Sequence, residues 1–244
     1  MPARITALCI DAVDPRRLAH FWAAALRWRV DTSSAGEVIT LVPTDATSFS
    51  IDVCQVAEPK AVRNRIHLDL TTESLDDQRD TVAELLALGA THLDVGQSPD
   101  ETHVVLADPE GNELCIIEPT NNFLSTCPRL GAVNCDGTRA TGLFWSAALD
   151  WPLVWDSGEE TAIQSPDGTG PKITWSGPPL LDKAGHKNRL HLDIAPVGAT
   201  QADELTRLVG LGARRVDIGQ GDVGWIVMAD PDDNEFCLLQ PTPP

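Results

Sequence analysis

The stretch Asn64-Arg-Ile-His-Leu-Asp-Leu70 returns 124 residues later as Asn188-Arg-Leu-His-Leu-Asp-Ile194. Two further blocks recur in the same order. Phe21-Trp-Ala-Ala-Ala-Leu26 returns as Phe144-Trp-Ser-Ala-Ala-Leu149, and Asp108-Pro-Glu-Gly-Asn-Glu-Leu-Cys115 returns as Asp230-Pro-Asp-Asp-Asn-Glu-Phe-Cys237. The shared order and nearly constant spacing indicate that a whole domain was duplicated. We therefore predict a first domain over residues 1–122 and a second over residues 128–244, joined by a polar segment.

Each predicted domain divides into two units with the same order of elements. In the first unit, residues 5–11 alternate weakly, as a strand does. Asp14-Pro15 then supplies a helix N-cap followed by proline at the first helical position. A helical apolar stripe continues from there to about Leu26. Strand-like runs follow near residues 28–32, 37–42 and 49–53.

The second half of the domain repeats this order. Residues 65–71 are predicted to form a strand and residues 74–88 a helix, with Gly89 just beyond its end. Strands are predicted near residues 92–95, 104–107 and 113–118. A βαβββ unit carries a helix on only one face of its sheet, so the other face must be covered or used. Pairing two such units produces a half-open barrel whose concave side can hold a ligand.

The charge balance limits the partners that the chain can bind. Acidic residues number 36 and basic residues 18, which gives a formal net charge of −18. Such a field repels phosphate backbones and anionic lipid, so neither nucleic acid nor a membrane surface is an expected partner. No apolar stretch approaches the length of about 18 residues that a membrane span needs.

The six cysteines and the N-terminus bear on the compartment. No two cysteines are spaced as CxxC, so neither a zinc knuckle nor a thioredoxin-like site is expected. The N-terminus lacks a charged segment followed by a long apolar run. We therefore expect a cytoplasmic protein with free thiols.

The βαβββ order, the Phe-Trp-x-Ala-Ala-Leu helix and the Asp-Pro-x-x-Asn-Glu-x-Cys closing strand resemble the glyoxalase/bleomycin-resistance members of the vicinal oxygen chelate (VOC) superfamily. More narrowly, they resemble the glyoxalase-like domain proteins. The resemblance covers residues 4–119 and 128–242, and implies an α+β fold of four βαβββ units paired into two half-open barrels in tandem. It is compatible with a monomer or a homodimer. It does not give a function, because the superfamily includes isomerases, lyases, dioxygenases, thiol transferases and drug-binding proteins.

The resemblance also implies metal-ligand positions on the first and last strand of each paired unit. In the second unit these positions fall on His67 and on Cys115, where the family usually has glutamate. In the first unit they fall on Ala7 and Asp52.

The second copy keeps the same pattern, with His191 and Cys237 as the repeated pair. Leu130 takes the place of Ala7, and the segment equivalent to Asp52 has no carboxylate. Catalytic metal sites normally have three protein ligands. We therefore expect no resident cofactor. The alternative, a divalent metal, would use His67 with Cys115, or His191 with Cys237.

The repeated Arg-x-His-x-Asp row is the strongest polar candidate. Side chains alternate across a strand, so Arg65, His67 and Asp69 are predicted to face the cavity. The arginine could hold an anion and the histidine could act as a general base. The alternative is a buried Arg–Asp pair with the histidine hydrogen-bonded between strands. Cys115 and Cys237 are interpreted as small buried side chains in preference to nucleophiles.

Aromatic residues distinguish the two copies. Trp155, Trp175 and Trp225 occur only in the second copy, and Trp225 replaces His103. Large flat side chains suit apolar aromatic ligands, although ordinary core packing is the alternative. We expect each copy to have its own cavity, and the two cavities to be unequal.

We therefore favour a soluble protein that binds a small apolar or aromatic molecule in a barrel cavity, without a complete family metal site. The alternative is a lyase, isomerase or dioxygenase that uses His67 or His191 as base or metal ligand. A third hypothesis is an interaction module whose cavities are filled by side chains. The predicted ligand-binding residues are Arg65, His67, Asp69, His103, Cys115, Trp175, Arg189, His191, Asp193, Trp225 and Cys237.

Overall fold

The computed structural model describes residues 3–31, 37–98 and 100–241. They form four successive βαβββ units, as predicted. Unit 1 comprises β1 (Ala3–Ala12), α1 (Pro15–Leu26), β2 (Arg29–Val30), β3 (Val38–Val42) and β4 (Ser50–Gln55). Unit 2 comprises β5 (Ile66–Leu70), α2 (Leu75–Ala87), β6 (Thr91–His92), β7 (Val104–Ala107) and β8 (Glu113–Ile116).

The second copy supplies the other two units. Unit 3 comprises β9 (Leu130–Cys135), α3 (Arg139–Leu149), β10 (Leu153–Ser157), β11 (Glu160–Ile163) and β12 (Lys172–Trp175). Unit 4 comprises β13 (Leu190–Pro196), α4 (Gln201–Leu211), β14 (Arg214–Arg215), β15 (Ile226–Ala229) and β16 (Glu235–Leu238). The predicted strand near residues 28–32 is shorter, and Thr32 lies outside the described residues.

Local capping sets the helix boundaries where the sequence predicts them. Asp14 accepts a hydrogen bond from the Arg17 backbone N–H at 3.1 Å and so caps α1. Gly89 follows α2 with φ of +100°, a left-handed conformation that glycine adopts without a steric cost. None of the described helices is long and apolar enough to cross a membrane.

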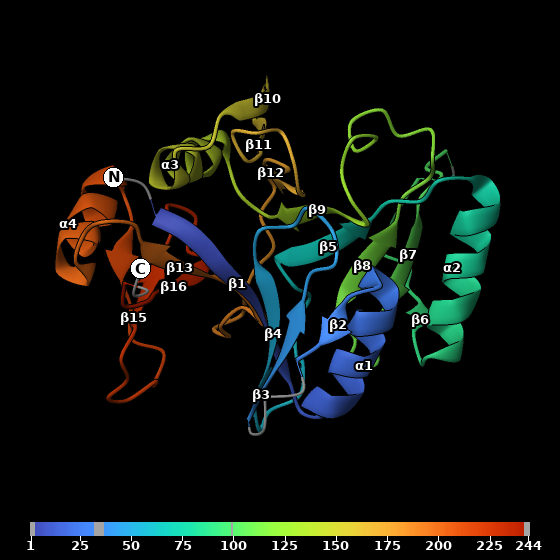
Figure 1. The fold of residues 1–244 in the computed structure, drawn as a ribbon, viewed down its shortest axis with the longest axis horizontal. Coiled ribbons are helices and arrows are strands. Elements are labelled where there is room, and N and C mark those ends of the chain that lie inside the picture. Colours follow the sequence, from blue (N-terminus) through green and yellow to red (C-terminus); the bar gives the residue numbers. More distant parts are fainter. Residues whose placement is uncertain (1–2, 32–36, 99, 242–244) are drawn as a thin grey trace.

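The four units pair across the two sequence copies. Sheet A joins unit 1 to unit 4 in the strand order β14-β15-β16-β13-β1-β4-β3-β2. Sheet B joins unit 3 to unit 2 in the order β10-β11-β12-β9-β5-β8-β7-β6. At each centre the first strands of the two units run antiparallel, β1 beside β13 and β5 beside β9 (Figure 1). The expectation that each copy has a cavity of its own is therefore wrong, because each sheet takes one unit from each copy.

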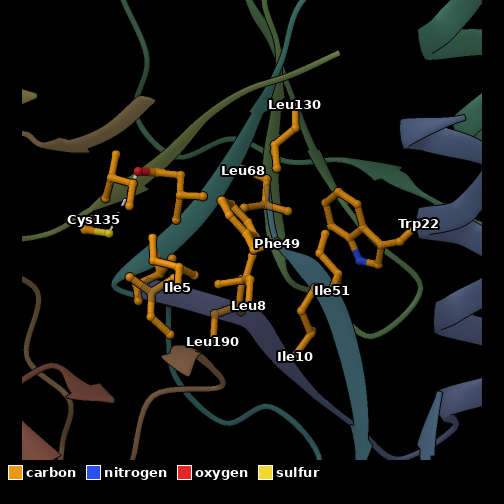
Figure 2. Packing of buried hydrophobic residues seen from close by; sticks show 14 of the residues in the cluster. Ile5, Leu8, Ile10, Trp22, Phe49, Ile51, Leu68, Leu130, Cys135 and Leu190 are labelled. Carbon is orange, nitrogen blue, oxygen red and sulfur yellow. Dashed lines mark hydrogen bonds between the residues drawn. The ribbon is translucent and has the colours of Figure 1, made fainter. Parts of the chain in front are cut away.

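A shared core explains this pairing. One hydrophobic cluster takes side chains from both sheets, including Leu8 and Ile51 of sheet A and Leu68 and Leu130 of sheet B (Figure 2). Helices α1 and α2 of the first copy contact each other, as do α3 and α4 of the second (Figure 1). Because the units of one copy bury their helix-bearing sides in this common core, their open faces cannot close on one another. Each open face is completed by a unit from the other copy.

Strand alternation follows the prediction on β5. Ile66 and Leu68 enter the core, whereas the side chain of His67 lies on the open face. The prediction for β9 is wrong in one respect. Leu130 is fully buried in the core and cannot occupy a ligand position. The residue opposite His67 on β9 is Asn134.

Candidate functional site

Two clusters of potential ligands lie at equivalent places on the two open faces. On sheet B, the side chains of His67, Asp69 and Cys115 bring donor atoms within 4.8 Å of one another, and we call them the sheet B triad. On sheet A, Cys9, His191 and Asp193 do the same, and we call them the sheet A triad. In both triads the histidine Nε2 lies 3.4 Å from a carboxylate Oδ1 of its aspartate.

Strand register places the sheet B triad. Parallel pairing of β5 with β8 sets Asp69 beside Cys115. Antiparallel pairing of β5 with β9 sets His67 opposite Asn134, whose amide donates to Asp69 Oδ2 at 3.5 Å. The structure therefore brings His67, Asp69 and Cys115 together on one face, and Asn134 joins them from the second copy.

Register on sheet A brings in a residue that the sequence analysis did not select. Cys9 of β1 lies opposite His191 of β13, and beside Asp52 of β4. Cys237 lies beside Asp193. The first-strand position of unit 1 is therefore Cys9 in place of the predicted Ala7. Only the pairing of β1 with a strand of the second copy identifies it.

Burial and negative charge shape the electrostatics of these faces. Burial is the largest influence on His67 and disfavours its charged form, but the carboxylates of Asp69, Glu113 and Asp136 outweigh it and raise its pKa above the usual value. Burial, followed by the neighbouring Asp69, raises the pKa of the Cys115 thiol. Burial and Asp193 do the same for Cys237. Both thiols are therefore poor nucleophiles, in keeping with the favoured interpretation.

The two predicted anion-holding arginines are already engaged. Arg65 donates through Nε to the Leu181 carbonyl at 2.6 Å and through Nη1 to the Asp232 carbonyl at 2.7 Å. Both acceptors belong to the second copy. The alternative of a buried Arg–Asp pair within the row does not hold either, because the guanidinium binds backbone carbonyls.

Arg189 makes the reciprocal contacts to the first copy. Its Nη1 donates to the Glu58 carbonyl at 2.8 Å, and its Nη2 lies 3.0 Å from Glu110 Oε2. The two arginines therefore link the two copies through these hydrogen bonds, and among the described residues the buried Arg189 Nε has no hydrogen-bond partner.

A cavity of about 360 Å³ opens on sheet B. Its apolar wall includes Phe123 of the segment between the copies and Trp155 of β10, whose rings meet edge to face with centroids 5.9 Å apart. Its polar lining includes Asp69, Asn134 and Thr174. Of these five, only Asp69 was among the predicted site residues.

The segment between the copies is held over this face by Lys172. The Lys172 Nζ donates to the Phe123 carbonyl and lies 4.5 Å from the centroid of the Phe123 ring. It also lies 3.7 Å from Cys127 Sγ. The polar composition of residues 119–128 gave no sign that Phe123 would wall a cavity. Lys172 and Phe123 are 49 residues apart in the sequence, so their contact forms only in the folded chain.

The remaining predicted residues lie apart from this cavity or behind it. Trp175 lines it, but the side chain is 1% exposed and packs in the core cluster. Its ring leaves no room for a side chain at Gly137, where an added Cβ would lie 2.5 Å from Trp175 Cδ1. Trp225 is 42% exposed just before β15. His103 lies before β7, with Nε2 at 3.6 Å from Glu101 Oε2.

The two open faces differ in the side chains that they place at the metal-ligand positions implied by the family resemblance. On sheet B the ligand positions that the resemblance implies hold His67, Cys115, Asn134 and Thr174, so one unit offers an imidazole and a thiol and the other an amide and a hydroxyl. These four positions contain no carboxylate, the ligand on which oxygen-coordinating metal sites mainly depend, so this set does not fit an oxygen-chelating metal. On sheet A the same positions hold Cys9, Asp52, His191 and Cys237.

The fold and the repeated sequence identify the class of the protein. A family model for the glyoxalase-like domain matches residues 7–117 and again residues 132–239. The chain therefore belongs to the glyoxalase-like domain family of the VOC superfamily, and carries two copies of the domain. No curated protein sequence matches the chain significantly.

Solved structures resemble the chain over nearly its whole length. Glyoxalase I from Zea mays superposes with a TM-score of 0.65 at 12% identity, covering 98% of this chain and 92% of that one. A putative dioxygenase from Bacillus subtilis subsp. subtilis str. 168 superposes with a TM-score of 0.59 at 13% identity, covering 98% and 85%. At these identities the likeness establishes the fold alone.

Proposed function

We propose that the chain binds a small molecule with a flat apolar part in the sheet B cavity. The observation that carries the proposal is the edge-to-face pair of Phe123 and Trp155 at the wall of a 360 Å³ cavity. Ligand cavities of this size are usually apolar with a few polar groups that orient the ligand. Trp155 is 46% exposed, so its ring is available to stack on a ligand.

Polar groups at the floor of the cavity would orient the ligand. The buried Thr174 Oγ1 has no hydrogen-bond partner in the described structure, and a buried hydroxyl is costly to leave unpaired. Asn134 lies beside it on the neighbouring strand β9, and Asp69 lies one strand further on, on β5. A ligand hydroxyl, amine or carbonyl could satisfy this hydroxyl.

Charge restricts the ligand further. The cavity lining includes the acidic side chains of Asp69 and Glu160, and the whole chain has a net charge of −18. A neutral or cationic ligand is therefore favoured over an anionic one, and the same field disfavours nucleic acid. Each sheet is completed within one chain, so a monomer suffices for this function.

A second candidate function is proton transfer on the bound molecule, as in an isomerase or lyase. His67 lies 3.4 Å from Asp69, which lines the cavity, and this carboxylate both orients the imidazole and supports its charged form. A histidine that is oriented by a carboxylate is suited to general acid–base catalysis.

Binding is tested with a panel of aromatic and heteroaromatic ligands, followed by tryptophan fluorescence and thermal shift. We expect at least one ligand to quench fluorescence and raise the melting temperature, and Trp155→Leu to lose both responses. Trp225→Leu is the matched control, because Trp225 is similarly exposed but lies on sheet A. Silence across the whole panel, or equal loss in both variants, would count against the proposal.

The second candidate is tested with His67→Gln. This variant should keep ligand binding within a few-fold of the parent while losing any turnover of the bound ligand. If ligands bind tightly but the parent protein never converts them, the second candidate is rejected and binding alone is the function.

A further inference from the structure

We propose that a cavity at the junction of the two copies binds a small zwitterion with one carboxylate and one ammonium group, as in a free amino acid. The cavity has a volume of about 430 Å³ and lies between residues 56–64, which link β4 to β5, and residues 183–189, which precede β13. The loop before β15 adds Asp217 and Ile218. None of the described residues that line it belongs to either triad or to the sheet B cavity. This site is therefore separate from the one proposed for sheet B.

The lining of this cavity is balanced in charge, unlike the chain as a whole. The sequence has twice as many acidic residues as basic ones, 36 against 18. The lining has equal numbers of the two kinds: Arg63, Lys183, Lys187 and Arg189 against Asp11, Glu58, Asp217 and Glu235, with His186 in addition. The net charge of −18 disfavours an anionic ligand, but it exerts little net force on a ligand that carries one charge of each sign.

Some of these charges are already paired within the protein. Lys187 forms an ion pair with Asp11, and Lys183 forms one with Glu235. Arg189 donates to the backbone carbonyls of Glu58 and Asp11, each at 2.8 Å. The contacts of Lys187 and Arg189 cross from the second copy to the first, so they hold the two sides of the cavity together.

Other charged groups of the lining have no partner of opposite charge. The side chains of Arg63, His186 and Glu58 make no hydrogen bond or ion pair with any described residue. Asp217 accepts a hydrogen bond only from the Gly219 backbone N–H, at 2.8 Å. The cavity therefore offers a guanidinium and an imidazole to a ligand carboxylate, and two carboxylates to a ligand ammonium group.

A comparison of the two copies explains why Arg63 is unpaired. Arg63 corresponds to Lys187 at the repeat offset of 124 residues. Asp11 and Asp136 also correspond, because each lies two residues beyond the residue that faces the histidine of the neighbouring strand. Lys187 pairs with Asp11, whereas Asp136 accepts a hydrogen bond from the Leu181 backbone N–H at 2.7 Å. Arg63 thus keeps a planar guanidinium that can bind a carboxylate through two parallel hydrogen bonds.

A buried donor in the wall gives a second indication of an anionic group. Arg189 lines the cavity, and its buried Nε has no hydrogen-bond acceptor in the part of the chain that the structure describes. A buried donor without an acceptor is costly. A carboxylate bound in the cavity would supply the missing acceptor.

The exposure of the unpaired groups sets the expected pattern of affinity. Arg63, His186, Glu58 and Asp217 are all exposed, and a single exposed ion pair contributes little to binding. Binding therefore depends on both ends of the ligand at once. A ligand that lacks either charge should bind at least about 5-fold more weakly than the zwitterion.

The test uses the full chain and the standard amino acids, added one at a time and followed by thermal shift and isothermal titration calorimetry. At least one amino acid should raise the melting temperature and bind as one molecule per chain. Its N-acetyl derivative lacks the ammonium group and its amide lacks the carboxylate, so both should bind at least about 5-fold more weakly. The proposal is overturned if no amino acid binds, or if either derivative binds as tightly as the amino acid.

Substitutions locate the site. Arg63→Gln and Glu58→Gln should each weaken amino-acid binding at least about 5-fold, and both should fold like the parent because these side chains are exposed and unpaired. Arg16→Gln is the matched control, since it removes the same charge from an exposed position on α1. Unchanged binding in Arg63→Gln, or equal weakening in Arg16→Gln, would overturn the proposal. Trp155→Leu should bind the amino acid like the parent, so this proposal and the one for sheet B can fail separately.

Discussion

The indole of Trp22 donates a buried hydrogen bond from Nε1 to Asp108 Oδ2, at 3.0 Å. Trp22 lies on α1 of unit 1, and Asp108 lies in the turn between β7 and β8 of unit 2. These units belong to different sheets, so the bond ties sheet A to sheet B within the first copy. Trp145 and Asp230 repeat it in the second copy at 3.1 Å.

Loss of this bond should lower stability measurably. Trp22→Phe keeps most of the apolar contact but leaves Asp108 Oδ2 without the indole donor in a buried site. We expect the free energy of unfolding to fall by about 1–3 kcal/mol. Urea denaturation followed by circular dichroism measures this. Trp155→Phe, at an exposed position, should change it by less than about 0.5 kcal/mol; equal effects would contradict the role assigned to the bond.

The carboxyl of Asp230 should make stability depend on pH. Burial raises its pKa from 3.8 to about 6, although hydrogen bonds from Asn234 and Trp145 oppose the shift. The folded state therefore binds the proton more tightly than the unfolded state does. The stabilising effect of protonation is fully present below pH 3.8 and is lost as the pH rises through about 6.

Asp230→Asn removes this titration. The stability of the parent relative to the variant should decrease by up to about 3 kcal/mol between pH 4 and pH 7, at about 1.4 kcal/mol per pKa unit. Denaturant unfolding at a series of pH values measures the difference. Asp222→Asn, at an exposed position, serves as the control. A difference between parent and Asp230→Asn that is independent of pH would show that Asp230 titrates normally.

Gly142 allows close contact between α3 and β11. A Cβ added there would lie 1.9 Å from Thr161 Oγ1 and 2.7 Å from Thr161 Cβ. Gly142→Ala should therefore force the helix away from the sheet and cost about 1–3 kcal/mol. Gly210→Ala is the matched control, because it also lies in a helix but has open space around it. It should stabilise the protein by about 0.5–1 kcal/mol. Thermal unfolding distinguishes the two variants.

Asp69 should control the protonation of His67. Burial, the largest influence, lowers the pKa of this histidine, and the neighbouring carboxylates reverse the shift. Asp69→Asn removes the nearest of them, so the pKa of His67 should fall. In the parent protein, the stabilisation from charged His67 is present below its usual pKa of 6.5 and is lost as the pH rises through the raised value. NMR titration of the imidazole measures the shift; Asp193→Asn on the other face should not alter it.

An isolated first copy should not form a stable folded monomer. In residues 1–122 the central strands β1 and β5 lose their antiparallel partners β13 and β9. Exposed strand edges pair with other chains. We expect this fragment to be unfolded, or to associate so that unit 1 of one chain pairs with unit 2 of another. Light scattering after size exclusion gives the mass. A folded monomer with a cooperative melt would contradict this.

Local features of the fold could be predicted because their causes are local. The Asp14 cap, the Gly89 helix end and the alternation along β5 each depend on residues close together in the sequence. For the same reason His67 and Asp69 were predicted on the open face. The repeat predicted the number of units. The family resemblance predicted that these units pair into half-open barrels.

The composition of each site could not be predicted, since it depends on which units meet. Cys9 faces His191 only if β1 pairs with β13, and no spacing within one copy gives that information. Phe123 reaches the cavity because Lys172, 49 residues away, holds its carbonyl. The contacts of Arg65, which was predicted to hold an anion, could not be predicted for a related reason. Arg65 finds its acceptors in the other copy, 116 and 167 residues further along the chain.

The pairing of β1 with β13 also has a consequence for synthesis on the ribosome. Thr6 on β1 hydrogen-bonds to the Asp193 carbonyl, 187 residues later. At a translation rate of about 5–20 residues per second, the first strand waits roughly 10–40 s for its partner to emerge. Until then the edges of β1 and β5 that will pair with β13 and β9 are unpaired in the nascent first copy. Strands of other chains can pair with these edges. Neighbouring ribosomes on one message could therefore produce swapped assemblies. The need for chaperones should be greatest while the second copy is being synthesised, because the first copy then exists without its partner strands.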